Sequence, residues 1–447
     1  MTIEVHQQET EQDNPQTDET AAPVNMPKIT KIEQYIFGKY DFRFNRVRLE
    51  TEFKEKEKNE TNFKTFDMDK NLNDISIDLQ KSGFSKPKEN ITELIRSSKV
   101  PEVHPIKDYF NLLTPIAGMK EFKKLCGYVQ LENLDISFEE KNYQELFEEY
   151  FFKWLMACYL CSMEKKHNDV MLILIGPQGV YKTSFQNYLC PVELAEYSVC
   201  GHIEPKMTEY LTAVYLTEKF LINVDDQMET IFGQNFNNMK AIVSAIEITS
   251  RKKYGKQDKR RRRIANFCGS VNNPQFLTDN ENRRYLCFQV KTIDKKYNTV
   301  DIRKLWSEVK YEAEKLKSWY LFGRNEYNAM MELSKYFSKP TTEEETLLRV
   351  FKPSTNNPEN QQYFMQFSEI LKVIRMVQRD NFLKDYLLRQ AMAKHKFVSK
   401  GYRKKRFGDN SRYLYNVECI MTADQMRSKY AVDMTEYEDS ADDEPNY

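Results

Sequence analysis

The sequence lacks several features that would assign it to a protein class at once. No apolar run approaches the roughly 18 residues that a membrane-spanning helix needs. The eight cysteines are scattered behind a polar amino-terminal stretch, so we expect a reducing, cytoplasmic location. The five histidines form no H-E-x-x-H set, which gives no support to a metalloprotease. Cys158 and Cys161 have no second pair at zinc-finger spacing, and their apolar helical surroundings predict thiols in a core.

The chain also lacks an excess of charge of either sign, with 67 basic and 67 acidic residues. The charges are nevertheless segregated along the sequence. Residues 251–263 carry nine basic side chains and one acid, residues 394–406 carry seven basic side chains and no acid, and the last stretch is acidic. A single basic run is most simply a solvated surface. Two such runs on either side of a nucleotide-type motif favour a polyanionic partner such as nucleic acid.

A chain of 447 residues is long enough for two or three domains. We expect a disordered tail at 1–28, a small region of unknown role at 29–105, and helices over 106–165. Strands and helices alternate over 166–345, which predicts an α/β domain. Two helices and a basic hairpin over 346–425 outline a winged-helix-like domain, and 426–447 is an acidic tail. Within 29–105, the stretch "IEQYIFGKYDFRFNRVRLETEF" alternates in the way strands do.

The segment "MLILIGPQGVYKTSFQNYL" resembles a phosphate-binding loop with one unusual residue. An apolar strand leads into glycines and a helix, so that backbone N–H groups can surround phosphates. Lys182 would reach the β- and γ-phosphates, and the Thr183 hydroxyl would bind Mg²⁺. The predicted nucleotide-binding residues are Gly176, Pro177, Gln178, Gly179, Val180, Tyr181, Lys182, Thr183 and Ser184. Tyr181 stands where the motif has glycine. The segment is therefore a functional nucleotide site with an unusual residue, an inactive site, or a chance match to the motif.

Two later strands end in polar residues that suit ATP hydrolysis. In "KFLINVDDQ", Asp225 would hold Mg²⁺ and Asp226 would orient or deprotonate the attacking water, although an acidic turn after a strand is also common. In "NFCGSVNNPQFL", Asn272, with Asn273 as the second choice, would position that water, and the alternative is a simple asparagine turn.

The segment "DNENRRYLCFQV" places Arg283 and Arg284 before another strand. A guanidinium here could act on the nucleotide of a neighbouring subunit or sense the γ-phosphate, and the alternative is a surface arginine pair. The catalytic set is therefore Lys182, Asp225, Asp226, Asn272, Arg283 and Arg284, with Thr183 and Asp225 as metal ligands.

Two groups of residues are predicted to bind DNA. Lys240, expected to open a helix, and Arg251, Lys252, Lys253 and Tyr254 combine cations with an aromatic ring that can stack on a base. The carboxy-terminal hairpin contributes Lys400, Arg403, Lys404, Lys405 and Arg406, and its turn is expected at Gly408–Asn410.

The ordered set of motifs resembles the virulence-associated protein E (VirE/VapE) family, P-loop ATPases of phages and mobile elements related to superfamily 3 helicases. The resemblance is best over about 100–295 and rests on the loop, the acidic pair and three further groups, namely Lys240 with Arg251 and Tyr254, Gly269-Ser270-x-Asn272, and Phe276-Leu277-x-Asp279 followed by Asn282-Arg283-Arg284. It implies an α/β fold with an AAA+/superfamily 3-like ATPase core, ATP and Mg²⁺ as ligands, single-stranded DNA as a partner, a homo-oligomer such as a hexameric ring, and a possible primase partner. The chain departs from the family at Tyr181 (glycine) and Asp226 (glutamate).

Three functional readings remain. The first is a DNA-stimulated ATPase, helicase or replication initiator, and the second is a scaffold that binds nucleotide with little or no turnover. The third, a small-molecule or nucleoside kinase, leaves the basic runs unexplained. For Tyr181 we expect a tolerated variation: a left-handed backbone there would cost on the order of 1–2 kcal/mol, and Gly179 could already make the turn.

Overall fold

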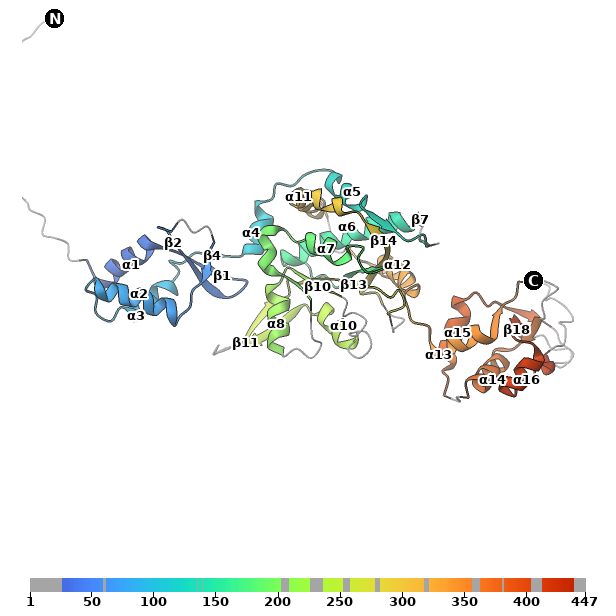
Figure 1. Cartoon of the computed structure of the whole chain (residues 1–447). Helices are drawn as coiled ribbons and strands as arrows, with labels where there is room; N and C mark the ends of the chain where they lie inside the picture. Colours follow the sequence, from blue (N-terminus) through green and yellow to red (C-terminus); the bar gives the residue numbers. More distant parts are fainter. Residues whose placement is uncertain are drawn as a thin grey trace, which may run out of the picture. The chain divides into compact units, whose positions relative to one another are not determined.

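The computed structural model describes residues 26–58, 62–134, 136–138, 140–201, 209–225, 236–251, 258–277, 282–316, 321–355, 362–379, 382–402 and 412–437. The chain forms two compact units (Figure 1). One is Met1–Thr114 together with Val192–Tyr197, and the other is Pro115–Pro191 together with Ser198–Tyr447. Most of the tail predicted at 1–28 lies outside the described residues, but Lys28 already begins a helix.

The first unit combines a small sheet with helices. The sheet has the strand order β3-β2-β1-β4. Its elements are α1 (Lys28–Lys39), β1 (Tyr40–Asn45), β2 (Glu50–Glu55), β3 (Lys64–Thr65), α2 (Lys70–Lys81), α3 (Lys88–Ile95), β4 (Glu102–Val103), α4 (Pro105–Leu112) and the 3₁₀ helix η1 (Val192–Tyr197). The strand prediction is therefore wrong for Ile32–Lys39. Ile32 and Ile36, one helical turn apart, are fully buried, so the helical period determines this segment.

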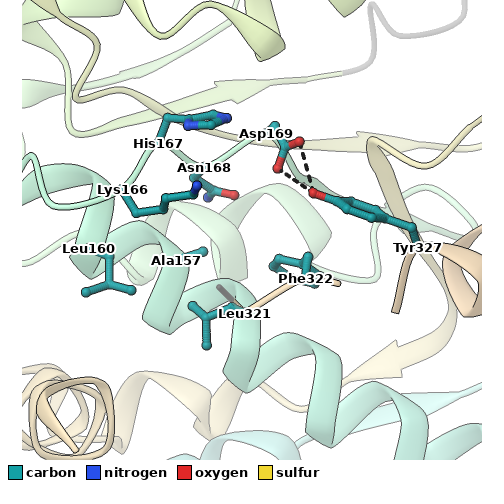
Figure 2. Close-up of a pocket in the computed structure, with 9 residues that line it drawn as sticks. All are labelled: Ala157, Leu160, Lys166, His167, Asn168, Asp169, Leu321, Phe322 and Tyr327. Carbon is teal, nitrogen blue, oxygen red and sulfur yellow. Dashed lines mark hydrogen bonds between the residues drawn. The ribbon is translucent and has the colours of Figure 1, made fainter. Parts of the chain in front are cut away.

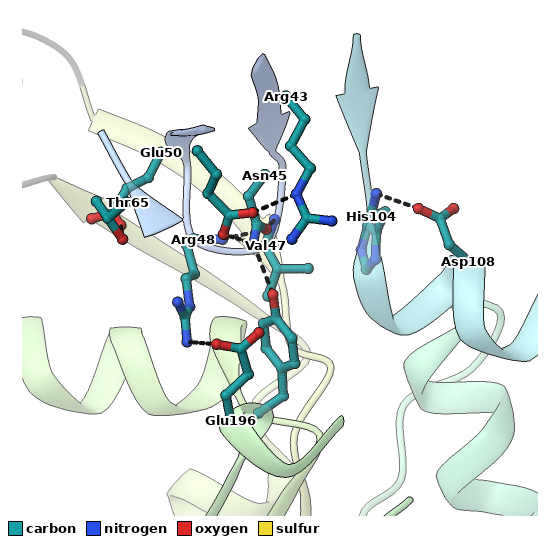
Figure 3. Close-up of polar contacts among 11 residues, drawn as sticks. Arg43, Asn45, Val47, Arg48, Glu50, Thr65, His104, Asp108 and Glu196 are labelled. Atoms are coloured by element: carbon teal, nitrogen blue, oxygen red, sulfur yellow. Dashed lines mark hydrogen bonds and ion pairs between the residues drawn. The ribbon is translucent and has the colours of Figure 1, made fainter. Parts of the chain in front are cut away.

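A buried polar network closes this unit (Figure 3). The Asn45 side chain donates to Glu52 at 2.7 Å and to the Tyr197 hydroxyl at 2.8 Å. Arg43 completes the network through an ion pair with Glu52 at 2.6 Å. Asn45 and Glu52 are almost fully buried, so each needs these partners to offset its desolvation. The network attaches η1 to the small sheet.

The second unit contains a six-stranded sheet with the order β5-β14-β8-β13-β10-β9. These strands are β5 (Val129–Leu131), β8 (Met171–Ile175), β9 (Ser198–Cys200), β10 (Leu221–Val224), β13 (Asn266–Val271) and β14 (Tyr285–Ile293). All neighbouring pairs from β14 to β9 are parallel, and only β5 is antiparallel. Consequently β8, β13 and β10 end at the same edge of the sheet, with β13 in the middle.

Helices cover both faces of this sheet (Figure 1). The elements around it are α5 (Lys120–Cys126), β6 (Ser137–Phe138), β7 (Lys141–Asn142), α6 (Tyr143–Ser162), α7 (Lys182–Tyr188), α8 (Glu209–Glu218), α10 (Phe236–Ser244), β11 (Glu247–Arg251), β12 (Asp258–Arg262), η2 (Lys295–Thr299), α11 (Ile302–Glu314) and α12 (Arg324–Lys335). Phe147 of α6 packs on Phe288 of β14, while Met239 and Val243 of α10 join the core on the opposite face. Because both faces are covered, every residue of β8 is buried.

The region 106–165 is less uniformly helical than predicted. Strand β5 lies between α5 and α6 and extends the central sheet by pairing with β14. Cys158 and Cys161 are buried on α6, as expected for core thiols, and burial raises the pKa of both. Among the described residues, no helix combines the length and the apolar character needed to span a bilayer.

The carboxy-terminal part of the second unit has a core of its own. It contains α13 (Thr342–Val350), β15 (Phe351–Pro353), β16 (Gln362–Met365), α14 (Phe367–Gln378), α15 (Asp385–Lys394), β17 (Ser399–Tyr402), β18 (Arg412–Cys419), α16 (Ala423–Tyr430) and the 3₁₀ helix η4 (Thr435–Tyr437). Strand β18 pairs antiparallel with β15, β16 and β17. The predicted boundary at 425 falls too early, because Met426, Val432, Met434 and Tyr437 are buried in this core.

Candidate nucleotide site

The loop between β8 and α7 is shaped by two glycines and one tyrosine. A Cβ added to Gly176 would lie 2.3 Å from the Val290 carbonyl oxygen on β14, so only glycine fits there without displacing backbone. Gly179 has φ 85° and Tyr181 has φ 67°, and both angles are in the left-handed region. Gly179 therefore does not remove the need for a left-handed residue at position 181. The loop residues Pro177–Gly179 are exposed.

Lys182, the first residue of α7, is buried with its ammonium group inside the loop. Its Nζ donates to the carbonyl oxygens of Gly176 at 2.7 Å and Pro177 at 2.8 Å, and to Asn272 Oδ1 at 3.1 Å. The side chain is only 5% exposed. All three acceptors are oxygen atoms that line the loop, and a buried ammonium forms its strongest hydrogen bonds with negatively charged oxygens. The geometry suits an incoming anion.

Three oxygen-bearing side chains meet next to the lysine. Asp225, directly after β10, accepts hydrogen bonds from Thr183 Oγ1 at 2.6 Å and Ser270 Oγ at 2.7 Å, both on its Oδ1 atom. The two hydroxyl oxygens are 3.1 Å apart. Carboxylate and hydroxyl oxygens are ligands that Mg²⁺ prefers. Sequence reasoning placed Ser270 in the Gly269-Ser270-x-Asn272 motif but gave it no role in the site, because a serine inside an apolar strand has no distinct chemistry by itself.

Buried amides fix α7 against the sheet. Gln186 Nε2 donates to the Gly269 carbonyl oxygen at 2.8 Å. Asn223 Nδ2 donates to Asn187 Oδ1 at 2.8 Å and to the Thr183 carbonyl oxygen at 3.3 Å. Because these amides lie on β10 and α7, they hold Thr183 in register with Asp225.

Tyr181 points its ring toward η2 and is 38% exposed. Lys295 Nζ lies 5.0 Å from the centroid of the ring, and a hydrogen bond with Tyr181 raises the pKa of this lysine. Ser184, the last of the predicted loop residues, hydrogen-bonds the neighbouring Tyr297, whose pKa is raised chiefly by burial. The Tyr181 side chain, which stands where the motif has glycine, therefore packs beside the loop and does not fill it.

Arg283 and Arg284 lie at the other end of the sheet from this loop. The backbone carbonyl of Arg284 accepts from the N–H of Met171, the first residue of β8. Gly176 follows at the far end of β8, so Arg284 is displaced from the loop by about six residues, or about 20 Å at 3.3 Å per residue. An arginine side chain cannot span that distance. Neither residue can therefore sense the γ-phosphate of its own chain.

The basic run 251–263 includes the last residue of β11 and the whole of β12, which pair antiparallel, and its described arginines differ in environment. Arg260 and Arg262 have side chains 76% and 56% exposed, with Glu247 as an ionic partner of both. Arg263 is buried and donates to the carbonyl oxygens of Val243 and Asn168, and burial lowers the pKa of its guanidinium. Arg263 is thus part of the core and unavailable to DNA.

The remaining predicted residues are only partly described. Lys240 lies in the middle of α10, half-buried, and does not open the helix as predicted, because the helical segment starts at Phe236. Lys400 is exposed on β17. Asp226, Lys252, Lys253, Tyr254, Arg403, Lys404, Lys405 and Arg406 lie outside the described residues, as does the Arg251 side chain. The strands β17 and β18 form the predicted hairpin, and its turn at Gly408–Asn410 is also outside them.

This geometry defines a class of protein. It is a mixed α/β protein with a mainly parallel sheet, in which lysine, hydroxyl and carboxylate groups lie together at one edge of the sheet. Within it, residues 122–339 match the Virulence-associated protein E-like domain. This match confirms the family resemblance that the ordered motifs predicted.

Solved structures of the NrS-1 C-terminal region are similar to the chain at low identity. One apo structure has a TM-score of 0.43 and 11% identity, and the match covers 88% of this chain and 99% of that one. An A-form apo structure has a TM-score of 0.42 and 11% identity, with 87% and 98% covered. At these scores nothing further follows from the likeness. Among curated proteins there is no match.

Proposed function

We propose that this chain is an ATP-dependent DNA motor, a helicase or replication-initiator ATPase of a mobile element, whose nucleotide binds at residues 176–184. The observation that carries the proposal is the meeting of Lys182, Thr183, Asp225 and Asn272 around one loop. These four residues come from α7 and from the ends of β10 and β13, and their types suit phosphate and metal binding. The match of residues 122–339 to the Virulence-associated protein E-like domain supports the same reading.

The site residues fit a magnesium-nucleotide ligand. Lys182 would exchange its carbonyl partners for phosphate oxygens, whose negative charge strengthens the hydrogen bonds of an ammonium group. Thr183 and Asp225 would hold Mg²⁺, which neutralises phosphate charge when bound. In this proposal Asn272 positions the attacking water and Asp226 activates it. Gly176 keeps the backbone close to β14, where a larger residue would displace the loop.

The proposed DNA contacts are the exposed basic side chains. Arg260 and Arg262 present charge on the β11–β12 hairpin, and Lys400 does so on β17. Such contacts bind backbone phosphates without sequence preference and weaken steeply with salt. We propose single-stranded DNA as the partner at the first hairpin, and a homo-oligomer, such as a hexameric ring, as the active assembly. A primase is the proposed protein partner.

One observation favours a second function, a nucleotide-binding scaffold with little turnover. Tyr181 holds a strained backbone within the loop, and the strain could slow the rearrangement that hydrolysis requires. Tight nucleotide binding without turnover would select this alternative.

The test is an ATPase assay with and without single-stranded DNA on the wild type, Lys182→Ala and a control, Lys335→Ala. Lys335 is an exposed lysine of α12 whose partner is Glu332. We expect DNA to stimulate turnover in the wild type and the control, and Lys182→Ala to abolish turnover while keeping DNA binding. Turnover that survives in Lys182→Ala would refute the assignment of the loop. A screen with phosphoryl acceptors would detect a kinase.

A further inference from the structure

Arg283 rests on an aromatic ring that is itself held by a carboxylate. Its guanidinium carbon lies 5.6 Å from the centroid of the Tyr327 ring on α12. The Tyr327 hydroxyl donates to Asp169, with distances of 3.1 Å to Oδ1 and 3.0 Å to Oδ2 (Figure 2). Asp169 precedes β8, and Arg283 precedes β14, so the three side chains connect two adjacent strands of the sheet to one helix.

The hydrogen bond to Asp169 is what orients the ring. Tyr327 and Asp169 both line a cavity of about 210 Å³, together with His167 and Phe322 (Figure 2). A ring packed on all sides is fixed by its neighbours, whereas a ring that borders a cavity needs a directional bond. Burial and Asp169 raise the pKa of Tyr327, so its hydroxyl remains a donor at neutral pH.

The two arginines of the pair are held differently. The Arg284 side chain donates to Ser244 Oγ on α10, which ties it to its own chain. Arg283 is exposed, and it lies over the Tyr327 face. A cation over a ring keeps its hydrogen-bonding edge available, because the attraction uses the face of the guanidinium. Arg283 is therefore the member of the pair suited to contact an anion.

We propose that Tyr327, held by Asp169, is a positioning residue that presents Arg283 to the nucleotide of a neighbouring copy of this chain. The inference rests on the proposed ATPase function. The loop of the same chain is about 20 Å away along β8, so the anion that Arg283 contacts belongs to another copy. Tyr327 touches no nucleotide in this arrangement and acts only through the arginine.

The first experiment measures kcat and KM for DNA-stimulated ATP hydrolysis in Arg283→Ala, Tyr327→Ala and Tyr327→Phe. Tyr311 gives a matched control, because it is a half-buried helical tyrosine whose ring lies 3.9 Å from Lys315 Nζ. We expect kcat to fall at least 100-fold in Arg283→Ala and about tenfold in Tyr327→Ala, with KM unchanged. Tyr327→Phe should give a smaller loss, and Tyr311→Ala none.

Two further measurements separate positioning from a structural role. In the double variant Arg283→Ala/Tyr327→Ala, kcat should equal that of Arg283→Ala alone, since the tyrosine acts only through the arginine. Adding an excess of Lys182→Ala chains, which carry an intact Arg283 and Tyr327, should raise turnover per Tyr327→Ala chain. The inference would be overturned if the losses in kcat of the two single variants added in the double variant. It would also be overturned if mixing with Lys182→Ala chains left the turnover per Tyr327→Ala chain unchanged.

The outcome also distinguishes this inference from the proposed function. Absence of turnover in the wild type would overturn both. Turnover that Lys182→Ala abolishes but Tyr327→Ala leaves intact would overturn the positioning role alone.

Discussion

The left-handed backbone at Tyr181 makes a prediction whose sign can be measured. A residue with a Cβ pays roughly 1–2 kcal/mol in this conformation, whereas glycine costs about 0.4–1 kcal/mol in unfolded-state entropy relative to alanine. Tyr181→Ala and Tyr181→Gly both remove the ring and its contact with Lys295. The difference between their free energies of unfolding therefore reports the cost of the backbone conformation alone. At the midpoints of these ranges, Tyr181→Gly should be more stable than Tyr181→Ala by about 0.8 kcal/mol.

Asn328 supplies the control, because it is an exposed residue in the interior of α12. Helix propensity makes alanine there more stable than glycine by about 1 kcal/mol. The sign of the alanine–glycine difference should therefore reverse between positions 181 and 328. Urea unfolding followed by tryptophan fluorescence is the assay, because all three tryptophans, at 154, 306 and 319, belong to the second unit. The same sign at both positions would refute the left-handed assignment.

The same variants report on the nucleotide. Tyr181→Gly keeps Lys182 and the carbonyl groups of the loop, and it removes a side chain that packs toward η2. We expect its affinity for MgATP, measured with a fluorescent analogue, to be similar to wild type or higher. A collapse in affinity would mean that the ring itself contacts the nucleotide.

Three further predictions concern other parts of the second unit. Gly176→Ala should lower the free energy of unfolding by about 1–3 kcal/mol, the usual cost of overpacking, because its Cβ would meet the Val290 carbonyl oxygen. Gly179→Ala has open space around its Cβ but keeps the cost of a left-handed residue, roughly 1–2 kcal/mol. Gly176→Ala should therefore weaken nucleotide binding more than Gly179→Ala, and equal effects in a nucleotide titration would contradict this. Ser270→Ala removes a donor to Asp225 and should cost about 1.5–3 kcal/mol in the same unfolding assay, while an unchanged stability would show that the hydroxyl bond is worth little. Burial alone would raise the pKa of Glu344, but hydrogen bonds from a lysine and a histidine hold this pKa below the usual range of a glutamate. The wild type should therefore lose stability as the pH falls below about 4.3, the ordinary glutamate value, and Glu344→Gln should lose less stability between about pH 6 and 3.

Much of the candidate site is predictable from sequence because it depends on strand ends. An apolar run such as β8 forms a buried strand, and the ends of parallel strands meet at one edge, so Lys182, Thr183, Asp225 and Asn272 come together. Ser270 escaped because a single serine inside an apolar strand carries no distinct signal. Its role depends on the order of β8, β13 and β10, which sequence spacing does not reveal.

The basic run shows a second limit of sequence reading. Four consecutive arginines, 260–263, read as one charged surface, yet their environments range from exposed to fully buried. Arg263 leaves the hairpin and enters the interior, where carbonyl oxygens of distant residues accept its hydrogen bonds. Those acceptors, the Val243 and Asn168 carbonyls, lie 20 and 95 positions away in the sequence, so no local pattern identifies them.

Separation of the two ends of the sheet leads to a last prediction. The loop that would bind phosphate follows β8, whereas Arg283 precedes β14 at the opposite edge, about 20 Å away. If hydrolysis depends on that arginine, a chain alone cannot complete its own site. Turnover per chain should then rise with protein concentration as copies associate, and light scattering on the same samples should show assembly over the same range. Arg283→Ala should assemble in the same way but keep a low, constant turnover per chain. The contrary result is a turnover per wild-type chain that stays constant down to concentrations at which light scattering detects only monomers. That result would refute dependence on a second copy, because every group needed for hydrolysis would then lie within one chain.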